Sequence, residues 1–407
     1  MSPLAPAAAL VTRWGAVAAV MAAGFAIALN VGKVPVALPA LRAQLGLSLV
    51  QAGWVSSTLS SIAFVGAAAV GMWVGRIGAL RMVLFGLLVC AVASLSALVS
   101  PGWGPLIASR LAEGVGFTLV AVACPALITA ATAPGDRRFG LGLWSSYMPA
   151  GASLAMAAAP WLLPRTGWPG LWLLTAVALV LAALALWLQR RRFDAGALPH
   201  PGDDGRILRP ALAALRQPLP WLLALAFGLW ATQHFALIVW MPTYLHEARG
   251  LGDGRVALLT GAMLVACVPG NLVGGWLVQQ GVRRGRLVAL AQLLTGLGAL
   301  GYSQEGWPDP LRYALAVSVS AIGGVIPAAV MASSTVLART PQQIGTLQGL
   351  YMQGAQLGQF VGTPLIAAVV AASGGAWSNA LWVTGPAALF GIALGLAAQR
   401  LEERLHA

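Results

Sequence analysis

Long apolar runs, separated by short polar stretches, repeat along the whole 407-residue chain. An α-helix needs about twenty apolar residues to cross a hydrocarbon layer of roughly 30 Å. Because lipid offers the backbone no hydrogen-bond partners, such runs predict membrane-spanning helices. The pattern therefore predicts an all-α membrane protein with twelve transmembrane helices, at residues 14–36, 51–74, 81–99, 105–132, 140–161, 170–189, 220–241, 256–278, 286–303, 313–337, 345–372 and 377–399.

Composition supports lipid as the main surrounding of this chain. Hydrophobic residues make up 59% and charged residues 9%, whereas a soluble domain carries roughly 25% charged residues. The net charge is +13, but the basic residues stand singly or in small groups at the ends of the runs, so nucleic acid is not expected as a partner. Cys90, Cys124 and Cys267 lie far apart with no CxxC pair, and they predict neither a disulfide nor a metal site.

The basic residues also predict an orientation. Alternate loops place 17 Lys and Arg residues on one side of the membrane and 7 on the other. Basic residues are enriched in cytoplasmic loops. We therefore expect a multi-pass protein of the bacterial inner (plasma) membrane with both termini in the cytoplasm. The long polar stretch predicts an N-terminal six-helix bundle at 1–189, a cytoplasmic central loop at 190–219 and a C-terminal six-helix bundle at 220–407.

The two halves resemble each other at an offset of 204 residues. The matching positions are Gly71 with Gly275, Tyr147 with Tyr351 and Pro160 with Pro364. Transporters are often built from repeated halves around a site near the middle of the membrane. The offset predicts a duplicated six-helix unit.

Three segments carry a resemblance to a known family. They are the loop GMWVGRIGALR at 71–81, its copy GWLVQQGVRR at 275–284, and RLAEGVGF at 110–117 in the fourth helix. Through them the chain resembles the major facilitator superfamily along its whole length. The acidic residue usual in the loop pattern is Gly75 in the first copy and Gln279 in the second, so the family's usual charge latch is not expected there. The resemblance implies a gating loop in each half, made by Gly71, Arg76, Gly78, Arg81, Gly275, Arg283 and Arg284.

The resemblance also implies an architecture and a branch. Two six-helix bundles would face a central cavity lined mainly by the first and fourth helices of each half and partly by the second and fifth, and would rock against each other to give alternating access. Residues 142–161 of the fifth helix and 236–244 of the seventh look most like the cyanate and nitroimidazole permease branch. Ala159-Pro160 stands where the family's antiporters have Gly-Pro, which disfavours proton-coupled drug efflux.

Charges in the hydrocarbon region are the first candidates for a functional site, because they are costly and usually face the bundle interior or water. Arg110 and Glu113 lie three residues apart on one helix and can pair. The pair is either structural or part of a site in which Lys33 shares Glu113 and leaves one net positive charge. Such a site would attract a small anion. Lys33 could instead reach the membrane interface, as basic residues near helix ends do.

Polar side chains on other helices extend the candidate site. His234 lies opposite Asn30 at the 204-residue offset and either couples a proton to transport or packs as a neutral group. Deep amides and hydroxyls either contact substrate or form interhelical hydrogen bonds. The candidate substrate-binding residues are Asn30, Lys33, Arg110, Glu113, Tyr147, Gln233, His234, Tyr351, Gln353 and Gln356.

These features favour a secondary active transporter that moves a small solute, with an anion preferred, across the inner membrane by alternating access. We expect a small-molecule substrate, a lipid bilayer, a coupled proton as an option and a functional monomer, with no cofactor and no metal. An enzyme is not expected, because Glu113 is essentially the sole intramembrane acid. The alternatives are proton-coupled efflux of lipophilic drugs and a non-transporting membrane sensor, although no loop is long enough to fold a signalling domain.

Overall fold

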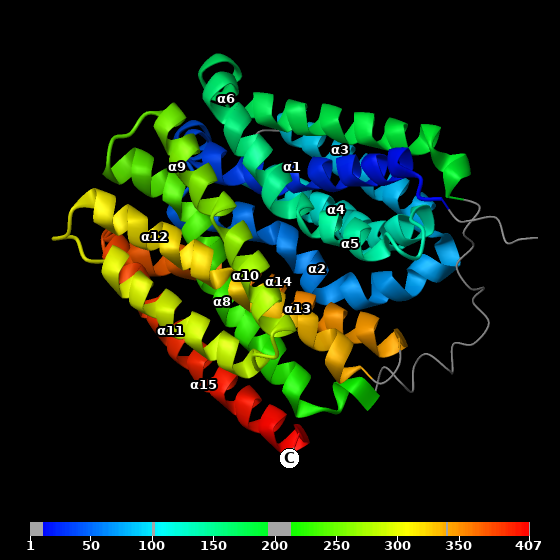
Figure 1. Cartoon of the computed structure of the whole chain (residues 1–407). Helices are drawn as coiled ribbons and strands as arrows, with labels where there is room; N and C mark the ends of the chain where they lie inside the picture. Colours follow the sequence, from blue (N-terminus) through cyan, green and yellow to red (C-terminus); the bar gives the residue numbers. More distant parts are fainter. Residues whose placement is uncertain (1–10, 100–101, 194–212, 339–340, 407) are drawn as a thin grey trace, which may run out of the picture.

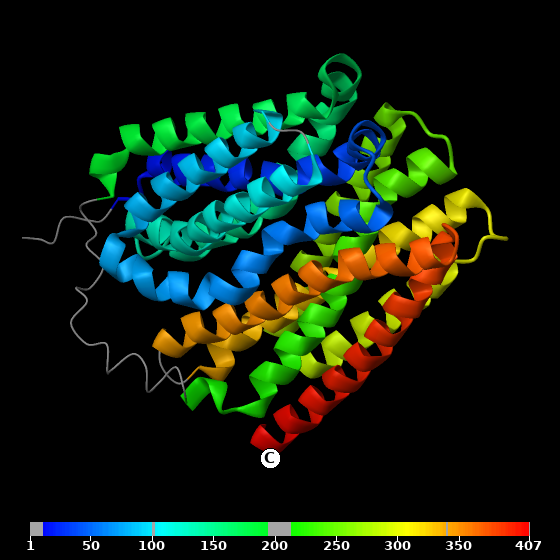
Figure 2. The same cartoon turned by 180° about the vertical axis from the view of Figure 1, so that it is seen from behind.

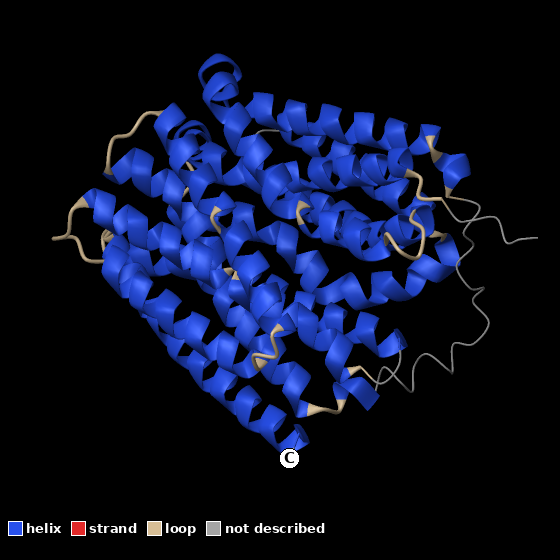
Figure 3. Ribbon diagram, viewed as in Figure 1, coloured by secondary structure: helices blue, strands red, loops and turns tan. Residues whose placement is uncertain are grey.

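The described part of the chain is a bundle of helices. The computed structural model describes residues 11–99, 102–193, 213–338 and 341–406. Within these ranges the chain forms helices and short loops and contains no strand (Figure 3). The all-α prediction is confirmed.

The first half follows the predicted spans closely. Helix α6 is interrupted at Gly167, whose φ of 62° and ψ of −163° are not helical, and Pro164 and Pro169 flank this break. A positive φ is strained for residues with a Cβ, so glycine is suited to this break. The part of α6 before Gly167 completes the fifth predicted span, and the part after it forms the sixth. The elements are α1 (Trp14–Leu45), α2 (Leu49–Ile77), α3 (Ala79–Val99), α4 (Trp103–Ala131), α5 (Arg137–Ser145), α6 (Tyr147–Leu188) and the short η1 (Arg190–Arg192).

The second half contains two further interrupted spans. Helices α9 and α10 share the span predicted at 256–278, and α12 and α13 share that at 313–337. The elements are α8 (Pro218–Thr243), η2 (Tyr244–Ala248), α9 (Asp253–Val265), α10 (Cys267–Gln279), α11 (Arg284–Tyr302), α12 (Asp309–Gly323), α13 (Val325–Leu337), α14 (Pro341–Ala372), η3 (Trp377–Ala380) and α15 (Leu381–His406).

The protein is a multi-pass membrane protein. In the described ranges, 10 stretches are long and apolar enough to cross a membrane. One of them, Phe139–Leu188, contains two predicted spans, and α11 accounts for the remaining one. Each of the twelve predicted runs therefore corresponds to a helix or to a kinked helix pair.

The two halves use the same close helix packing. Helix α1 packs along α6, and its counterpart α8 packs along α14. Gly24 and Gly228 lie 204 residues apart: a Cβ on Gly24 would lie 2.9 Å from the Cβ of Tyr147, and a Cβ on Gly228 would lie 2.7 Å from the carbonyl oxygen of Gly354. Small residues let membrane helices approach this closely. Corresponding positions thus perform the same task, as a duplicated unit requires.

One apolar core spans both halves at one end of the molecule, and each half has a core of its own at the other. Near the end opposite the termini, one apolar core contains Leu38 and Leu41 from the first half and Ile238 and Val370 from the second. Towards the termini, each half has a core of its own. Figures 1 and 2 show α1 beginning and α15 ending on the side opposite the loops that join α8 to α9 and α11 to α12. The structure is closed at the end away from the termini.

Gly362→Ala is expected to lower the unfolding temperature of the detergent-solubilised protein. The added Cβ would lie 2.7 Å from the carbonyl oxygen of Thr232 on α8 and 2.8 Å from its Cα, and overpacking of this kind costs about 1–3 kcal/mol. Gly349→Ala on the same helix is the matched control, because no neighbouring atom lies within 4 Å of its added Cβ. That change should leave stability unchanged or raise it by up to about 1 kcal/mol. Equal unfolding temperatures for the two variants would contradict the packing argument.

Candidate functional site

A small cavity lies between the two halves. Its volume is about 20 Å³, enough for about one water molecule. The first half contributes residues of α1, α2, α4 and α6, and the second half contributes residues of α8 and α14. The polar part of the lining consists of Ser56, Ser57, Ser60, Arg110, Gln356, Gln359 and Thr363. The expected role of the fourth helix of the second half is not seen, since neither α12 nor α13 contributes to this lining.

Arg110 is the charged residue among the described side chains that line this cavity. Its guanidinium donates through NH1 to Oε2 of Glu113, one turn further along α4. The other carboxylate oxygen, Oε1, lies 2.6 Å from Nζ of Lys33 on α1. All three side chains are at most 1% exposed. Two cations therefore share one carboxylate, and the cluster carries one net positive charge.

Additional hydrogen bonds hold the two cations in place. The three N–H groups of the Lys33 ammonium are directed to Glu113, to Oδ1 of Asn30 at 2.8 Å and to Oγ of Ser94 at 2.6 Å. Nε of Arg110 donates to the carbonyl oxygen of Val55 at 3.1 Å. A buried charge needs such partners, because removal from water is expensive. Lys33 is fully buried and does not reach the interface, and Arg110 alone brings the positive charge to the cavity wall.

The polar residues of the second half form separate, neutral contacts. Nε2 of Gln233 donates to Oε1 of Gln292 at 3.0 Å. Nε2 of His234 lies 2.8 Å from Oγ of Ser320, and the imidazole stacks on Trp230 with ring centroids 4.6 Å apart. Neither Gln233 nor His234 lines the central cavity. Nδ1 of His234 is buried and has no hydrogen-bond partner in the described part of the chain.

Two of the candidate residues face the central cavity, and the others do not. Tyr147 stacks on Trp144 with centroids 4.2 Å apart, and the hydroxyl of Tyr351 accepts a hydrogen bond of 2.8 Å from Ser333. Both tyrosines belong to the separate cores near the termini. Gln353 lies on α14 but is not part of the lining of the central cavity. Arg110 and Gln356 line the cavity, and Oε1 of Gln356 is buried without a hydrogen-bond partner among the described residues.

Five polar residues of the lining are absent from the candidates predicted from the sequence: Ser56, Ser57, Ser60, Gln359 and Thr363. Ser56, Ser57 and Ser60 line the cavity. The hydroxyl of Ser60 donates to Oε1 of Gln359 at 3.1 Å and so links the two halves. A run of hydroxyl residues, SSTLSS at 56–61, in an apolar span was the available signal.

The two predicted gating loops differ in their contacts. In the first, Gly78 has a φ of 92° at the turn into α3, and Arg81 is exposed. The side chain of Arg76 and the surroundings of Gly71 lie outside the described part of the structure. In the second, which follows Gly275 in α10, Arg283 and Arg284 approach two acidic residues of α15: Arg283 NH1 lies 2.6 Å from Glu403 Oε1, and Arg284 NH1 lies 3.7 Å from Glu402 Oε1. Acidic residues of the last helix thus pair with this loop, whose own motif lacks the acid.

A family model confirms the resemblance. The model described as Major Facilitator Superfamily matches residues 18–363, most of the chain.

Curated relatives include transporters of anions and a resistance protein. The chain is 26% identical to the sodium-dependent phosphate transport protein 1, chloroplastic, of Arabidopsis thaliana, over 57% of this chain and 48% of that protein. It is 26% identical to the gallate transporter of Pseudomonas putida, over 64% of each chain. It is 25% identical to the methylenomycin A resistance protein of Streptomyces coelicolor, over 93% of this chain and 88% of that protein. The chain spans about half or less of the length of the first relatives it matches.

A solved structure has the same fold. A bacterial homologue of the human lysosomal transporter Spinster, crystallised in an inward-facing and unoccupied conformation, superposes with a TM-score of 0.78. The match covers 96% of this chain and 98% of that chain at 14% identity. At this identity the likeness establishes the fold.

Glu113→Gln is expected to destabilise the protein more than Lys33→Met. Removing the shared carboxylate leaves two buried cations without a counter-charge, a loss of about 3–5 kcal/mol. Removing Lys33 leaves the Arg110–Glu113 pair, which is neutral. Thermal unfolding of the purified variants in the same detergent measures the difference. A lower unfolding temperature for Lys33→Met than for Glu113→Gln would be inconsistent with a shared carboxylate.

Proposed function

Because the chain belongs to the major facilitator superfamily, we propose that it is a secondary active transporter that moves a small anion by alternating access of its two halves. The observation that carries this proposal is the position of Arg110. Its guanidinium lines the cavity between the halves, and the carboxylate beside it is shared with Lys33.

The charge balance of the site favours an anion. Lys33, Arg110 and Glu113 are all buried and together carry one net positive charge. At a separation of 4 Å and an effective dielectric constant of about 20, a unit anion would gain roughly 4 kcal/mol of Coulomb energy from that charge, before its own desolvation is subtracted. Among the described residues of the lining there is no carboxylate. Arg110 donates one N–H each from Nε and NH1 to protein partners, so the two N–H groups of NH2 remain for a ligand.

Gln356 and Gln359 complete the site from the opposite half. Both line the cavity on α14, and the buried Oε1 of Gln356 lacks a partner in the described chain. An amide can turn its NH₂ group towards an anion and donate hydrogen bonds to it. The cavity now holds about one water, so substrate enters when the halves rock apart. Because each half has a core of its own near the termini, we propose that this opening lies at the terminal end.

The relatives support an anion as the substrate and leave one alternative function. The names of two of them specify phosphate and gallate transport. A third is named for resistance to methylenomycin A and matches 93% of this chain, which makes drug efflux the second candidate. The paired state of Glu113 weighs against export of lipophilic cations, because such a substrate needs an unpaired intramembrane carboxylate.

The proposal also covers the membrane, the orientation and the oligomeric state of the protein. We place the protein in a bacterial inner membrane with both termini in the cytoplasm, divided at the central loop 190–219. A single chain contributes every residue of the central cavity, which favours a functional monomer. His234 is the candidate for a coupled proton: it is buried on α8, hydrogen-bonded to Ser320, and has a free Nδ1 among the described contacts.

Arg110→Gln is expected to reduce anion uptake by proteoliposomes at least tenfold, because the variant removes the charge that the cavity presents. Uptake of [³²P]phosphate and [¹⁴C]gallate is measured for both proteins. Arg255→Gln, at an exposed position of α9, is the control and should transport like the wild type. Thermal unfolding verifies that each variant is folded, and a saturating anion should stabilise the wild type by about 2.7 kcal/mol at 100 times its dissociation constant.

Two results would overturn the anion proposal. One is uptake by Arg110→Gln equal to that of the wild type. The other is stabilisation of the wild type by the lipophilic cation tetraphenylphosphonium with none by any anion, which would favour drug efflux.

His234→Asn is expected to flatten the pH profile of uptake, since histidine is the side chain most able to change charge near neutral pH. Ser320→Ala is the control, because it removes the hydrogen bond to the imidazole and keeps the titrating group. That variant should retain a pH-dependent rate. If His234→Asn retains the full wild-type profile, His234 is a packing residue and another group handles the proton.

A further inference from the structure

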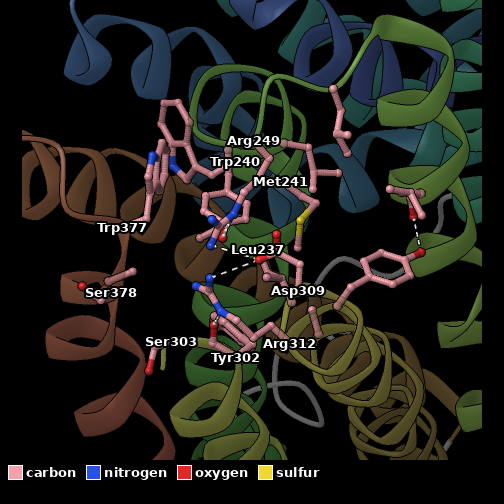
Figure 4. A pocket seen from close by; sticks show the side chains of 18 of the residues that line it. Leu237, Trp240, Met241, Arg249, Tyr302, Ser303, Asp309, Arg312, Trp377 and Ser378 are labelled. Atoms are coloured by element: carbon pink, nitrogen blue, oxygen red, sulfur yellow. Dashed lines mark hydrogen bonds and ion pairs between the residues drawn. The ribbon is translucent and has the colours of Figure 1, made fainter. Parts of the chain in front are cut away.

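A larger cavity lies in the second half, at the end of the molecule opposite the termini (Figure 1), and Figure 4 shows the side chains that line it. Its volume is about 450 Å³, within the range of about 300–1,000 Å³ typical of small-molecule sites. Its walls come from the end of α8, from η2, α9, α11, α12, α14 and η3. It shares no lining residue with the central cavity. The proposed transport site therefore does not account for it.

The charged side chains of this cavity sum to one positive charge. Asp309 forms ion pairs with two arginines: its Oδ1 lies 3.1 Å from NH2 of Arg249 and 3.6 Å from NH1 of Arg312. Figure 4 shows the three side chains meeting in the middle of the cavity. Asp309 is 60% exposed, whereas the Arg312 side chain is 8% exposed. Water screens the carboxylate far better than the buried guanidinium.

Arg312 has an unused donor. Its Nε donates to the carbonyl oxygen of Tyr302 at 2.9 Å. Its NH1 is buried and has no hydrogen-bond partner among the described residues. The carboxylate of Asp309, 3.6 Å away, forms an ion pair with NH1. A buried donor left without a hydrogen bond costs free energy. A carboxylate ligand in the cavity would satisfy this group.

Five aromatic residues stand among an otherwise largely aliphatic lining: Trp240, Tyr244, Tyr302, Tyr313 and Trp377. Both guanidinium groups lie near the Tyr244 ring, with Cζ of Arg249 5.4 Å and Cζ of Arg312 5.7 Å from its centroid. The rings of Trp240 and Trp377 lie 5.7 Å apart by centroid. The indole N–H of Trp240 donates to the carbonyl oxygen of Thr363, so its ring face is what remains for a ligand. Aromatic rings favour offset-stacked or edge-to-face contact with other rings.

From these observations we propose that the cavity is a second binding site, for an organic monoanion that carries an aromatic ring. The carboxylate would contact Arg312 and Arg249, and the ring would lie against Tyr244 and Trp377. This site goes beyond the transport proposal, because binding here requires neither Arg110 nor movement of the two halves.

Equilibrium binding of [¹⁴C]benzoate to the full-length, detergent-solubilised Arg110→Gln protein tests the site with the central cavity disabled. We expect one saturable site per chain. Adding Arg312→Gln should weaken benzoate binding at least tenfold, and adding the exposed Arg255→Gln should not change it. Inorganic phosphate at the same concentration should not displace benzoate, because phosphate lacks the ring.

Two substitutions at accessible positions keep the test independent of folding at Arg312. Asp309→Asn removes the competing carboxylate and should tighten benzoate binding severalfold. Trp377→Leu removes an aromatic wall and should weaken binding at least threefold. Binding that is unchanged in both variants, or absent from the parent protein, would overturn the proposal, as would displacement by phosphate as effective as that by unlabelled benzoate. If the wild type takes up no anion but the benzoate binding follows this pattern, the transport proposal is refuted and the proposal of this second site stands.

Discussion

Two buried cations compete for one carboxylate in the first half, and this arrangement sets the chemistry of the protein. Glu113 lies between Lys33 and Arg110, and Ser94 and Asn30 complete the ammonium's hydrogen bonds. Helices α1, α3 and α4 are thereby joined by charge-assisted bonds in a region where water cannot replace them. Because one positive charge is left over, the cluster both stabilises the bundle and supplies the charge on which the proposed preference for anions rests.

The two halves share a scaffold and differ in chemistry. Gly24 and Gly228 permit the same helix contact in each half. Where the first half has an ionic cluster, the second has the neutral pairs Gln233–Gln292 and His234–Ser320. An anion held by Arg110 would therefore be bound mainly by the first half. The second half could then move against it while breaking only neutral contacts from Gln356 and its neighbours.

Closure at the end opposite the termini depends on a few identifiable contacts between the halves. Helices α1 and α8 share an apolar core there and Arg42 pairs with Glu247, while at the central cavity Ser60 bonds to Gln359. The ion pair between partly exposed side chains contributes little stability, and the core contributes more. Opening of this end would break these contacts while the larger cavity, whose lining lies within the second half, keeps its walls.

The sequence by itself determined the helical class, the approximate limits of the spans, the duplication and the family, because the lipid solvent enforces long apolar helices whose pattern is local. It also offered a cluster of Lys33, Arg110 and Glu113 as one of two alternatives, the other being a Lys33 side chain that reaches the membrane interface. Only the tertiary structure decided that Arg110 and Gln356 reach the central cavity, whereas His234, Tyr147 and Tyr351 pack away from it. Only the tertiary structure decided that Ser60 joins the halves. It alone also revealed the second cavity, which is lined by Arg249, Asp309 and Arg312. The side of a helix that faces its neighbour depends on the rotation of the helix about its own axis and on kinks, such as that at Gly167. When a helix is apolar on every side, the amino-acid pattern does not encode that rotation.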